Sequence, residues 1–397
     1  MSNKVPQIRF NGYSDAWVQR KLGELMDVSS VKRIHQSDWT SSGVPFYRAR
    51  DIVAKAKGKE IEEPIYISQD KYDEYSAVSG KVQPGDLLVT GVGTIGIPLL
   101  IDGREPLYFK DGNIIWFKNH HAIDGSFFFH QFRSQRVQKF IKDVAGIGTV
   151  GTYTIDSGKK TPFNLPVDEA EQQKVGLFFD ELDNLIAANQ RKLDLLKEQK
   201  KGYLQKMFPK NGAKVPELRF AGFADDWEER KLSDIADRFD NLRVPITASD
   251  RKSGDTPYYG ANGIQDYVEG FTHDGEFILV AEDGANDLKN YPVQYVNGKV
   301  WVNNHAHVLQ GKKTITDNKF LMNSIKNFNI EPFLVGGGRA KLNADVMMKL
   351  NVLLPTFEEQ EKIGSFFKQL DDTITLHQRK LDLLKEQKKG LLQKMFV

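Results

Sequence analysis

A glycine pattern at residues 91–96, GVGTIG, has the spacing of a dinucleotide-binding turn. That chemistry requires a helix directly after the glycines, because the backbone N–H groups and dipole of a helix N-terminus bind the pyrophosphate. Residues 97–102, IPLLID, are instead typical of a strand, and Pro98 comes early in this segment. We therefore predict a tight glycine turn here, and no nucleotide site.

Two histidines and two acidic residues could form a metal centre. His305 and His307 lie two residues apart in a segment that we expect to be a strand, so their side chains point the same way. A metal site needs a further ligand nearby, and the sequence places none beside this pair. Glu282 and Asp283 resemble the start of a metal-dependent nuclease motif, but the acidic residue and lysine that should follow are missing. We predict a polar turn at residues 282–283 and no metal site.

Other catalytic patterns are absent from the sequence. The chain has no cysteine, which excludes cysteine nucleophiles and thiolate metal sites and is typical of a reducing compartment. It has no GxxxxGK[ST] phosphate loop and no NPPY-type methyl-transfer tetrapeptide. EQK triplets at residues 198–200 and 386–388 lie in predicted coiled-coil helices, which do not suit a nuclease centre. We therefore expect a chain that is not an enzyme by itself.

Composition indicates a globular protein with a charge that is nearly balanced. The 397 residues are 40% hydrophobic and 11% aromatic, enough for two domains with their own cores. The net charge is +2, from 55 basic and 53 acidic residues, so net charge gives no general argument for nucleic-acid binding. The sequence has no apolar run long enough to span a membrane and no apolar signal core at its N-terminus. We expect a soluble, cytoplasmic protein without a membrane partner.

The elements that would position any site are duplicated. Residues 190–208, QRKLDLLKEQKKGYLQKMF, return at residues 378–396 and differ only at Tyr203/Leu391. A second repeat opens each half, VPQIRFNGYSDAWVQRKL at residue 5 and VPELRFAGFADDWEERKL at residue 215, and we expect each tryptophan to anchor the start of its domain. The segments between these repeats share little obvious sequence. This pattern predicts one scaffold that carries two different recognition domains.

Each repeated segment ends a long helix with a coiled-coil seam. Apolar residues alternate in steps of four and three from Val175 to Met207 and again from Ile363 to Met395. We predict that the two helices form an antiparallel pair and that the halves are related by a pseudo-two-fold axis. Asn189 and His377 occupy the same polar seam position, and such residues often fix register. We therefore expect these two side chains to lie close together.

The predicted fold class is α+β. Residues 86–90, 113–118, 276–281 and 299–304 are short β-branched and aromatic runs that indicate strands, and residues 127–144 have the spacing of one helix. We expect target-recognition domains at residues 1–165 and 209–355. The long helices should follow at residues 166–208 and 356–397, each with an acidic first turn and the second with Thr356 as its N-cap.

With this frame, the chain resembles the specificity subunit of type I restriction-modification enzymes. The resemblance rests on VPxxRFxGxxxxWxxRKL at the start of each half and on the QRKLDLLKEQKKGxLQKMF helix at its end. Phrases within the domains add to it: GVPFYRARDI at residue 43, TPYYGANGIQDYVEGF at residue 256 and VAEDGA at residue 280. It covers essentially the whole chain.

The resemblance implies a non-catalytic subunit of an ATP-dependent type I site-specific deoxyribonuclease and adenine-DNA methyltransferase. Each domain would recognise one half of an asymmetric, bipartite target in double-stranded DNA. The repeated helices would hold two methyltransferase subunits, and the assembly would recruit two motor-nuclease subunits. S-adenosylmethionine, ATP and Mg²⁺ would bind to those partners, and no cofactor to this chain.

Within this interpretation, basic, amide and aromatic side chains in polar or glycine-rich segments are candidates for DNA contacts. In the first domain they are Lys32, Arg33, His35, Gln36, Trp39, Arg48 and Arg50, of which Arg48 and Arg50 should share a face of a strand. In the second domain they are Arg243, Arg251, Lys252, Tyr258, Tyr259, Asn262, Arg339 and Lys341. Candidates for contacts with protein partners are the repeated basic residues Arg191, Lys192, Lys200, Lys201, Arg379, Lys380, Lys388 and Lys389.

A different class of function fits the residues alone. A coiled-coil adaptor whose two domains bind proteins or other ligands would also need a repeated helix and two unlike domains. A standalone nuclease would need a catalytic site that the sequence does not show. Neighbouring genes for a methyltransferase and a helicase-nuclease would distinguish a restriction-modification subunit from an adaptor.

Overall fold

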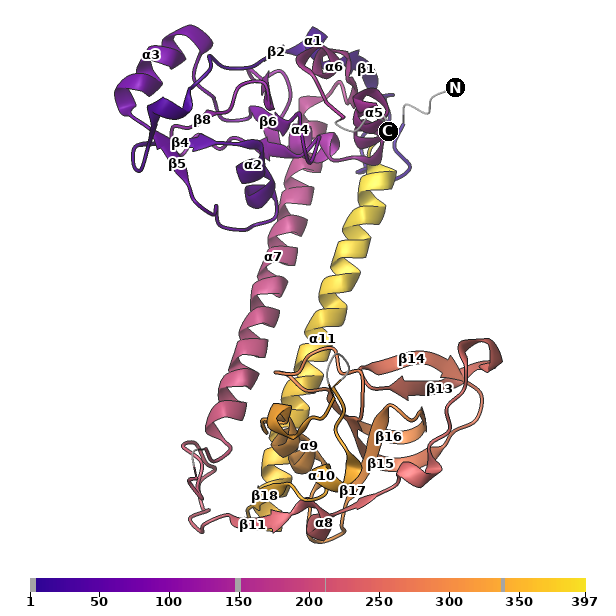
Figure 1. Ribbon diagram of the computed structural model, residues 1–397. Coiled ribbons are helices and arrows are strands. Elements are labelled where there is room, and N and C mark those ends of the chain that lie inside the picture. Colours follow the sequence, from indigo (N-terminus) through magenta and orange to yellow (C-terminus); the bar gives the residue numbers. More distant parts are fainter. Residues whose placement is uncertain (1–4, 147–150, 211, 337–339) are drawn as a thin grey trace. The chain divides into compact units, whose positions relative to one another are not determined.

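The computed structural model describes residues 5–146, 151–210, 212–336 and 340–397, and it divides into two compact units. Unit 1 comprises Met1–Gln190 and Lys380–Val397, and unit 2 comprises Arg191–Arg379. Each unit combines a domain of sheets and short helices with parts of two long helices (Figure 1). The predicted α+β class, with two globular domains and two long helices, is confirmed.

The described residues of unit 1 form three small sheets, with strand orders β1-β10, β2-β9-β6-β7 and β3-β5-β4-β8. The strands are β1 (Val18–Lys21), β2 (Asp27–Ser29), β3 (Trp39–Thr40), β4 (Val44–Tyr47), β5 (Ile65–Ile67), β6 (Leu87–Thr90), β7 (Pro98–Leu100), β8 (Tyr108–Phe109), β9 (Ile114–Lys118) and β10 (Pro162–Leu165). The helices are α1 (Leu22–Leu25), the 3₁₀ turn η1 (Gln36–Asp38), α2 (Ala49–Ala56), α3 (Gln69–Ser79), α4 (Gly125–Phe132), α5 (Gln135–Ala145), α6 (Ile155–Lys160) and the start of α7 (Glu169–Lys206).

Two predictions for unit 1 have different outcomes. The glycine pattern at residues 91–96 is a turn between the antiparallel strands β6 and β7, as predicted, and Gly96 has the positive φ of +77° that favours glycine. The single helix predicted at residues 127–144 is wrong, because α4 ends at Phe132 and α5 begins at Gln135. Arg133 and Ser134 separate the two helices, because Ser134, the N-cap of α5, has an extended backbone with φ −62° and ψ 153°.

Unit 2 contains a six-stranded sheet of order β12-β17-β15-β16-β13-β14 and the two-stranded sheet β11-β18. The strands are β11 (Glu228–Lys231), β12 (Ala236–Arg238), β13 (Ser253–Gly260), β14 (Gly263–Val268), β15 (His273–Ala281), β16 (Val293–Val302), β17 (Ala306–Gly311) and β18 (Asn351–Leu354). The helices are α8 (Leu232–Ile235), the 3₁₀ turns η2 (Asp240–Leu242), η3 (Ala248–Asp250) and η4 (Glu331–Phe333), α9 (Asn318–Lys326), α10 (Ala344–Met347) and α11 (Phe357–Met395).

The domains of the two units share a topology that their sequences hardly show. The order β2-β9-β6-β7 in unit 1 corresponds to β12-β17-β15-β16 in unit 2. In each unit one further pair is parallel, β4 with β8 and β13 with β16. Phe46 and Tyr258, which follow the prolines of PFY and PYY, are each 1% exposed in these pairs. The duplication therefore includes the middle segments as well as the repeated frame.

The repeated tryptophans anchor the domains, as predicted. Trp17 is 1% exposed and packs edge-on against Phe127 and Phe396 in unit 1. Trp227 is also 1% exposed and packs against Phe208 and Phe320 in unit 2. The final phenylalanine of each repeated segment, just past the end of its helix, thus lies in a domain core.

Buried ion pairs tie the start of each domain to a long helix. Arg9 binds both carboxylate oxygens of Glu171 on α7, at 2.6 and 2.8 Å. Arg219 binds both oxygens of Glu359 on α11 in the same way, at 2.8 Å each. Both carboxylates are almost fully buried, and the bidentate geometry offsets the cost of removing these charges from water.

The two long helices run antiparallel within each unit. In unit 1, Asp183 of α7 pairs with Lys388 of α11, and in unit 2 Lys200 of α7 lies 2.5 Å from Asp371 of α11. The predicted seam positions are buried or half-buried in both helices. Thr356 caps α11 by accepting a hydrogen bond from the Glu359 amide, as predicted. No helix in the described part of the chain is both long and apolar enough to cross a membrane.

Candidate nucleic-acid interface

The segment between β2 and β3 in unit 1 places four of the predicted DNA contacts at the surface. Lys32, Arg33, His35 and Gln36 are all exposed. The guanidinium of Arg33 is 67% exposed although its Nε lies 2.8 Å from Asp111. Lys32 lies over the ring of Tyr75, with Nζ 3.9 Å from the centroid. These side chains are accessible to a ligand, and their contact with DNA stays a prediction.

The structure changes the interpretation of the other three residues predicted in this domain. The strand predicted to carry Arg48 and Arg50 ends at Tyr47, and Arg50 lies in helix α2, so the two arginines do not share a strand face. Arg48 is engaged by Asp51 at 2.7 Å and is 18% exposed, whereas Arg50 is 58% exposed. Trp39 is half-buried and its ring lies 6.0 Å from that of Phe46, as expected of a residue at the edge of a core.

Helix α3 adds basic residues that the sequence analysis did not select. Lys71 lies over Tyr75, and Lys81 follows the helix and lies over Tyr72, with Nζ 4.8 and 5.0 Å from the ring centroids. Together with Lys32, these residues form a group of cations on aromatic rings. The sequence does place Lys71, Tyr72 and Tyr75 close together in one helix. This spacing identifies a basic surface only when α3 is known to lie beside Lys32.

In unit 2, three of the predicted contacts are accessible, and the other described ones are buried or half-buried. Lys252 and Asn262 are exposed, and the side chain of Lys341 is 45% exposed. Tyr258 is a core residue, so its prediction as a DNA contact is wrong. Arg251 covers the ring of Tyr258 at 4.2 Å and is 16% exposed, and Tyr259 is half-buried. Arg339 lies outside the described residues.

Arg243 has a structural role instead of the predicted DNA contact. Its Nη1 lies 2.6 Å from Glu282 and 2.9 Å from the carbonyl oxygen of Ala306, and the side chain is 15% exposed. Glu282 also binds Lys341, at 2.8 Å. The carboxylate therefore joins an arginine after η2 to the segment that carries Lys341.

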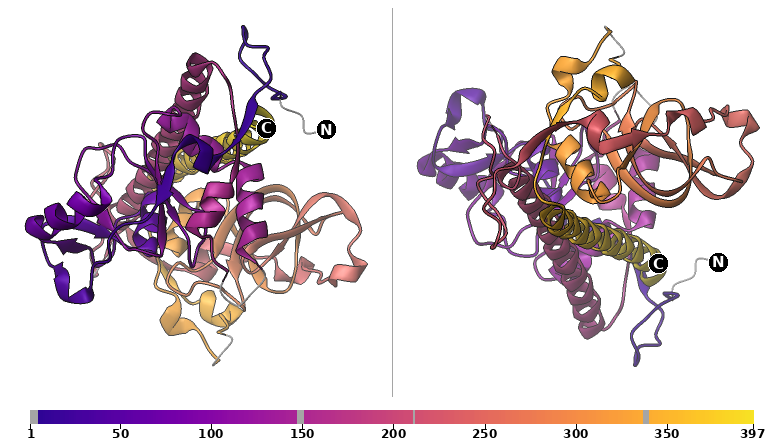
Figure 2. Two further views of the ribbon diagram at one scale, coloured as in Figure 1. Left: turned by 90° about the horizontal axis from the view of Figure 1, so that it is seen from above. Right: turned by 90° about the horizontal axis from the view of Figure 1, so that it is seen from below.

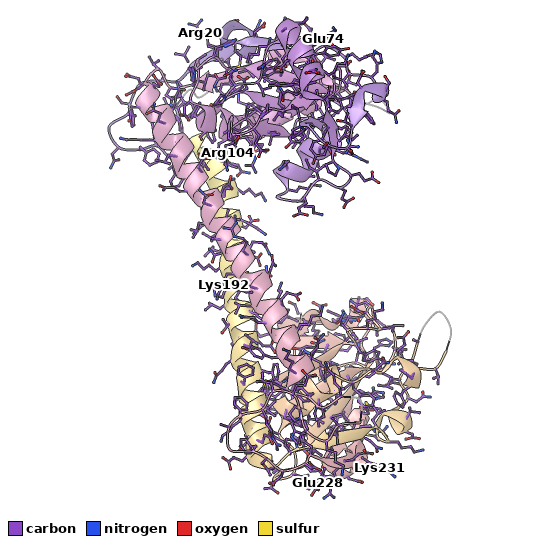
Figure 3. The ribbon with its side chains drawn as sticks, turned by 90° about the vertical axis from the view of Figure 1, so that its left-hand side faces the viewer. Arg20, Glu74, Arg104, Lys192, Glu228 and Lys231 are labelled. Atoms are coloured by element: carbon purple, nitrogen blue, oxygen red, sulfur yellow. The ribbon has the colours of Figure 1, made fainter. Side chains whose placement is uncertain are left out.

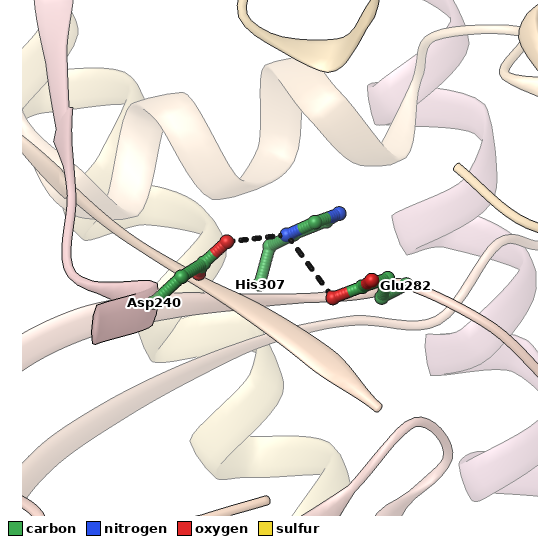
Figure 4. A group of neighbouring side chains, drawn as sticks. All are labelled: Asp240, Glu282 and His307. Carbon is green, nitrogen blue, oxygen red and sulfur yellow. Dashed lines mark hydrogen bonds and ion pairs between the residues drawn. The ribbon is translucent and has the colours of Figure 1, made fainter. Parts of the chain in front are cut away.

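Asp240, Glu282 and His307 bring potential metal-ligand atoms within 4.8 Å of one another (Figure 4). His307 has Nδ1 2.7 Å from Asp240 and Nε2 2.8 Å from the carbonyl oxygen of Leu342. Both ring nitrogens of His307 are therefore engaged by other groups of the chain. The contacts of Arg243 and Lys341 supply further positive charge, and the group is an ion-pair network.

Electrostatics in this network favour ionised carboxylates. Burial acts to raise the pKa of Asp240, but hydrogen bonds from His307 and the Val308 amide and the charge of Arg243 hold it below its ordinary value. Burial likewise acts against ionisation of Glu282, and hydrogen bonds from Lys341 and Arg243 lower its pKa. The network therefore connects Lys341 and Leu342 to His307 of strand β17, through Glu282 and through the Leu342 carbonyl oxygen.

An exposed aromatic surface at the edge of the unit 2 sheet was also missed. Tyr267 of β14 and Phe271 are 52% and 47% exposed, and Nζ of Lys299 lies 4.8 Å from the Phe271 ring centroid. The β13–β14 hairpin lies on the side of the sheet away from α11 (Figures 1 and 2). Alternation along β14 was a possible signal, but Ile264, Gln265, Asp266 and Tyr267 are all exposed, so the strand lacks a simple period of two.

The repeated basic residues divide into two groups. Most are exposed and available to a partner, as Figure 3 shows for Lys192 on α7. They are Arg191, Lys192, Lys201, Arg379, Lys380 and Lys389. Lys200 and Lys388 instead pair with Asp371 and Asp183, and their side chains are 16% and 9% exposed. We therefore assign these two lysines to helix pairing and remove them from the set of partner contacts.

The lysine–aspartate pairs also bear on the helix register. In unit 1 the Nζ of Lys385 donates to Gln190, next to Asn189, and in unit 2 the Nζ of Lys197 donates to Gln378, next to His377, both at 3.4 Å. Asn189 donates to the carbonyl oxygen of Leu185 in its own helix. Asn189 belongs to unit 1 and His377 to unit 2, and the close approach predicted for these two side chains stays a prediction. The Lys388–Asp183 and Lys200–Asp371 ion pairs are equivalent polar contacts between the helices, one in each unit.

Comparison with known proteins also indicates two equivalent halves in this chain. The type I restriction modification DNA specificity domain model matches residues 14–198 and 224–386. A type I restriction enzyme specificity subunit of Haemophilus influenzae is 44% identical over 154 residues, covering 39% of this chain and 39% of that protein's length. The MjaX specificity subunit of Methanocaldococcus jannaschii is 19% identical over 396 residues, covering 95% of this chain and 92% of that protein.

A solved structure shows the same fold. The crystal structure of the S subunit of a type I restriction-modification system from M. genitalium has a TM-score of 0.69 at 16% identity and covers 99% of each chain. The domain model matches once in each half and covers most of the sequence. The chain belongs to the DNA specificity family of type I restriction-modification systems.

Proposed function

We propose that this chain is the DNA-recognition subunit of a type I restriction-modification complex, and that each unit recognises one half of an asymmetric, bipartite target. The observation that carries the proposal is that the two halves share their buried anchors and long helices but differ in their exposed side chains. Trp17/Trp227, Arg9/Arg219 and the nineteen-residue helix segments repeat, whereas the exposed polar side chains of the domains do not. One topology with two different surfaces suits the recognition of two unlike base sequences, because base edges are distinguished by the side chains that reach them.

The accessible candidates define where each unit would contact DNA. In unit 1 they are the exposed residues Lys32, Arg33, His35, Gln36, Arg50 and Lys81, with the half-buried Lys71 beside them. In unit 2 they are Lys252, Asn262, Tyr267, Lys299 and Lys341. Both sets combine cations for phosphate contact with amide or aromatic groups that can contact bases. The sets share no sequence pattern, which supports different half-sites for the two units.

The repeated helices would each hold one methyltransferase subunit. Leu195 and Leu383 are equivalent residues, and both are exposed on the helices, at 52% and 59%. A Cβ atom added at Gly202 or Gly390, two turns further on, would meet no atom within 4 Å, so packing within the chain does not require glycine there. A mid-helix glycine costs about 1 kcal/mol relative to alanine. Its presence in both copies supports two equivalent sites of close approach by one kind of partner.

The catalytic steps would belong to partners. Two methyltransferase subunits would bind S-adenosylmethionine, and two motor-nuclease subunits would bind ATP and Mg²⁺. The test is to express the chain with the methyltransferase encoded beside it in a host without DNA methylation, and to map modified adenines by single-molecule sequencing. The proposal predicts methylation at two short, unlike sequences separated by a fixed non-specific spacer. A contiguous motif, or methylation without any motif, would contradict it.

A further inference from the structure

Unit 2 contains a cavity of about 310 Å³ between helix α9, strand β16 and the first half of α11. Three lysines line it: Lys319 and Lys326 from α9, and Lys368 from α11. Tyr295 and Met322 form part of its wall. The volume is at the lower end of the range for pockets that take small molecules. The cavity is therefore a small, partly open pocket whose lining has more cationic than anionic side chains.

The acidic residues of this cavity are already neutralised. Asp371 lies 2.5 Å from Lys200, and both carboxylate oxygens of Asp372 lie within 2.6 Å of Lys368. The Lys326 ammonium has no ion pair or hydrogen bond with any described residue. The Nζ of Lys319 lies 6.0 Å from the Tyr295 ring centroid and interacts electrostatically with Asp317. Neither ammonium group on this face of α9 forms an ion pair at contact distance with a described residue.

The surroundings of Lys326 disfavour an ammonium group that has no counter-ion. Burial lowers the pKa of its amine below the ordinary value, Lys200 lowers it further, and Asp371 offsets only part of this effect. A cation that is enclosed and unpaired destabilises the folded chain unless it loses its proton or gains a counter-ion. An anion in the cavity would satisfy it.

The equivalent place in unit 1 has no such excess among its described residues. Asp124 caps α4 as Asp317 caps α9, which aligns Arg133 with Lys326 and Ser126 with Lys319. Arg133 pairs with Asp183 at 3.3 Å, and Ser126 binds Asp180 at 2.5 Å, where unit 2 has Lys368. The duplicated frame therefore carries paired groups in one unit and unpaired lysines in the other.

We propose that the cavity between α9, β16 and α11 is a binding site for a phosphate-type oxyanion, held by Lys319 and Lys326. Lysine ammonium groups are point charges that bind phosphate oxygens without a fixed orientation, which suits two long side chains about two turns apart on one face of a helix. The space beside them has room for more than a bare ion, so free phosphate and a phosphate ester share the required chemistry. This site goes beyond DNA recognition and is proposed for unit 2 alone.

The test is calorimetric titration of the full-length chain with inorganic phosphate and, separately, with adenosine 5′-monophosphate, against potassium chloride at equal ionic strength. We expect one site per chain, with competition between the two probes. Tighter binding of the nucleotide would identify a phosphate ester as the ligand, and tighter binding of inorganic phosphate would identify the free ion. K326M and K319M should each weaken binding about tenfold, the effect of losing one charged hydrogen bond.

K349M is the matched control, because Lys349 is a lysine of the same unit that does not line the cavity. It should bind both probes like the wild type. K326M should also unfold at the same or a higher temperature than the wild type without phosphate, because it removes an unpaired enclosed cation. The proposal is overturned if phosphate has no more effect than chloride, or if K326M and K319M both bind phosphate with wild-type affinity.

Discussion

His130 illustrates how one residue couples burial to charge in unit 1. Its side chain is 0% exposed, and Nε2 lies 2.7 Å from Asp180, to which the neutral ring donates. Burial lowers the pKa of His130, the hydrogen bond and charge of Asp180 act in the opposite direction, and the nearby Lys388 lowers it further. The folded chain therefore keeps this ring neutral at a pH where the unfolded chain protonates it.

The stability contribution of His130 should consequently depend on pH. It is complete above the ordinary pKa of about 6.5, and it is lost as the pH falls through that value toward the lowered pKa of the folded state. Replacement by asparagine, the residue that unit 2 has at the equivalent Asn323, should flatten the dependence. We predict that the urea midpoint of the wild type falls more between pH 7 and pH 5 than that of H130N. The exposed-site control H35N should follow the wild type, and equal slopes for H130N and the wild type would refute the account.

Single residues also show what the sequence could and could not predict. Trp17 and Trp227 are predictable as anchors because a repeated tryptophan in a repeated frame has few other uses. Tyr258 and Arg243 are mistaken for DNA contacts because local composition suggests an open, polar segment. Their true partners, Ile246 in the backbone and Glu282 on another segment, are fixed by strand pairing that no local pattern encodes.

Helix junctions show how the duplicated elements are held. Gly176 of α7 and Gly364 of α11 lie against the capped N-termini of α4 and α9, where an added Cβ would come within 2.7 Å of Asp124 and 2.3 Å of Asp317. Gln172 and Gln360 bind the amides of the same two caps. Side chains larger than glycine would force these helices apart. The two glycines and two glutamines are therefore docking points for the recognition domains.

The helix pair in unit 1 should depend on the ion pair between Asp183 and Lys388. The side chain of Lys388 is 9% exposed, so D183N would leave a nearly buried ammonium without its carboxylate. We predict a loss of about 2 kcal/mol in the free energy of unfolding, and recovery of more than half of it in D183N/K388M. Urea denaturation measures both changes.

Asp143 provides the control for this pair. It is 64% exposed in an ion pair with Lys139 on α5, so D143N should change stability by less than about 0.5 kcal/mol. If D183N were as mild as D143N, the pair would not be a determinant of helix association.

The exposed leucines of the repeated helices should matter for assembly and not for folding. Charged residues at Leu195 and Leu383 would face solvent in the free chain, so L195D and L383D should leave the thermal midpoint nearly unchanged. Each should lower the number of methyltransferase subunits bound per chain from two toward one, and the double variant should bind neither. Native mass spectrometry of the mixed subunits measures this ratio. Binding of two subunits by the double variant would exclude this surface.

At the scale of the whole molecule, duplication makes the sequence informative. The nineteen-residue repeat, its 4,3 spacing and the repeated tryptophan segments suffice to predict two α+β domains and two long helices. The common topology of the domains is not predictable, because it rests on β4 with β8 and β13 with β16, parallel pairs that share little more than PFY and PYY. The sequence indicates which residue types could contact DNA. It does not indicate which of them are exposed, because exposure depends on packing between segments that are far apart in the chain.

The central claim is that each unit recognises its own half of the DNA target. The most direct test replaces residues 236–350 with the corresponding segment of another family member, keeps both long helices, and maps methylated adenines by single-molecule sequencing with the same methyltransferase. The reciprocal chimera replaces residues 27–161. We predict that each chimera changes one half of the motif and keeps the other half and the spacer. A single replacement that changes both halves, or an active chimera with the original motif, would contradict the account.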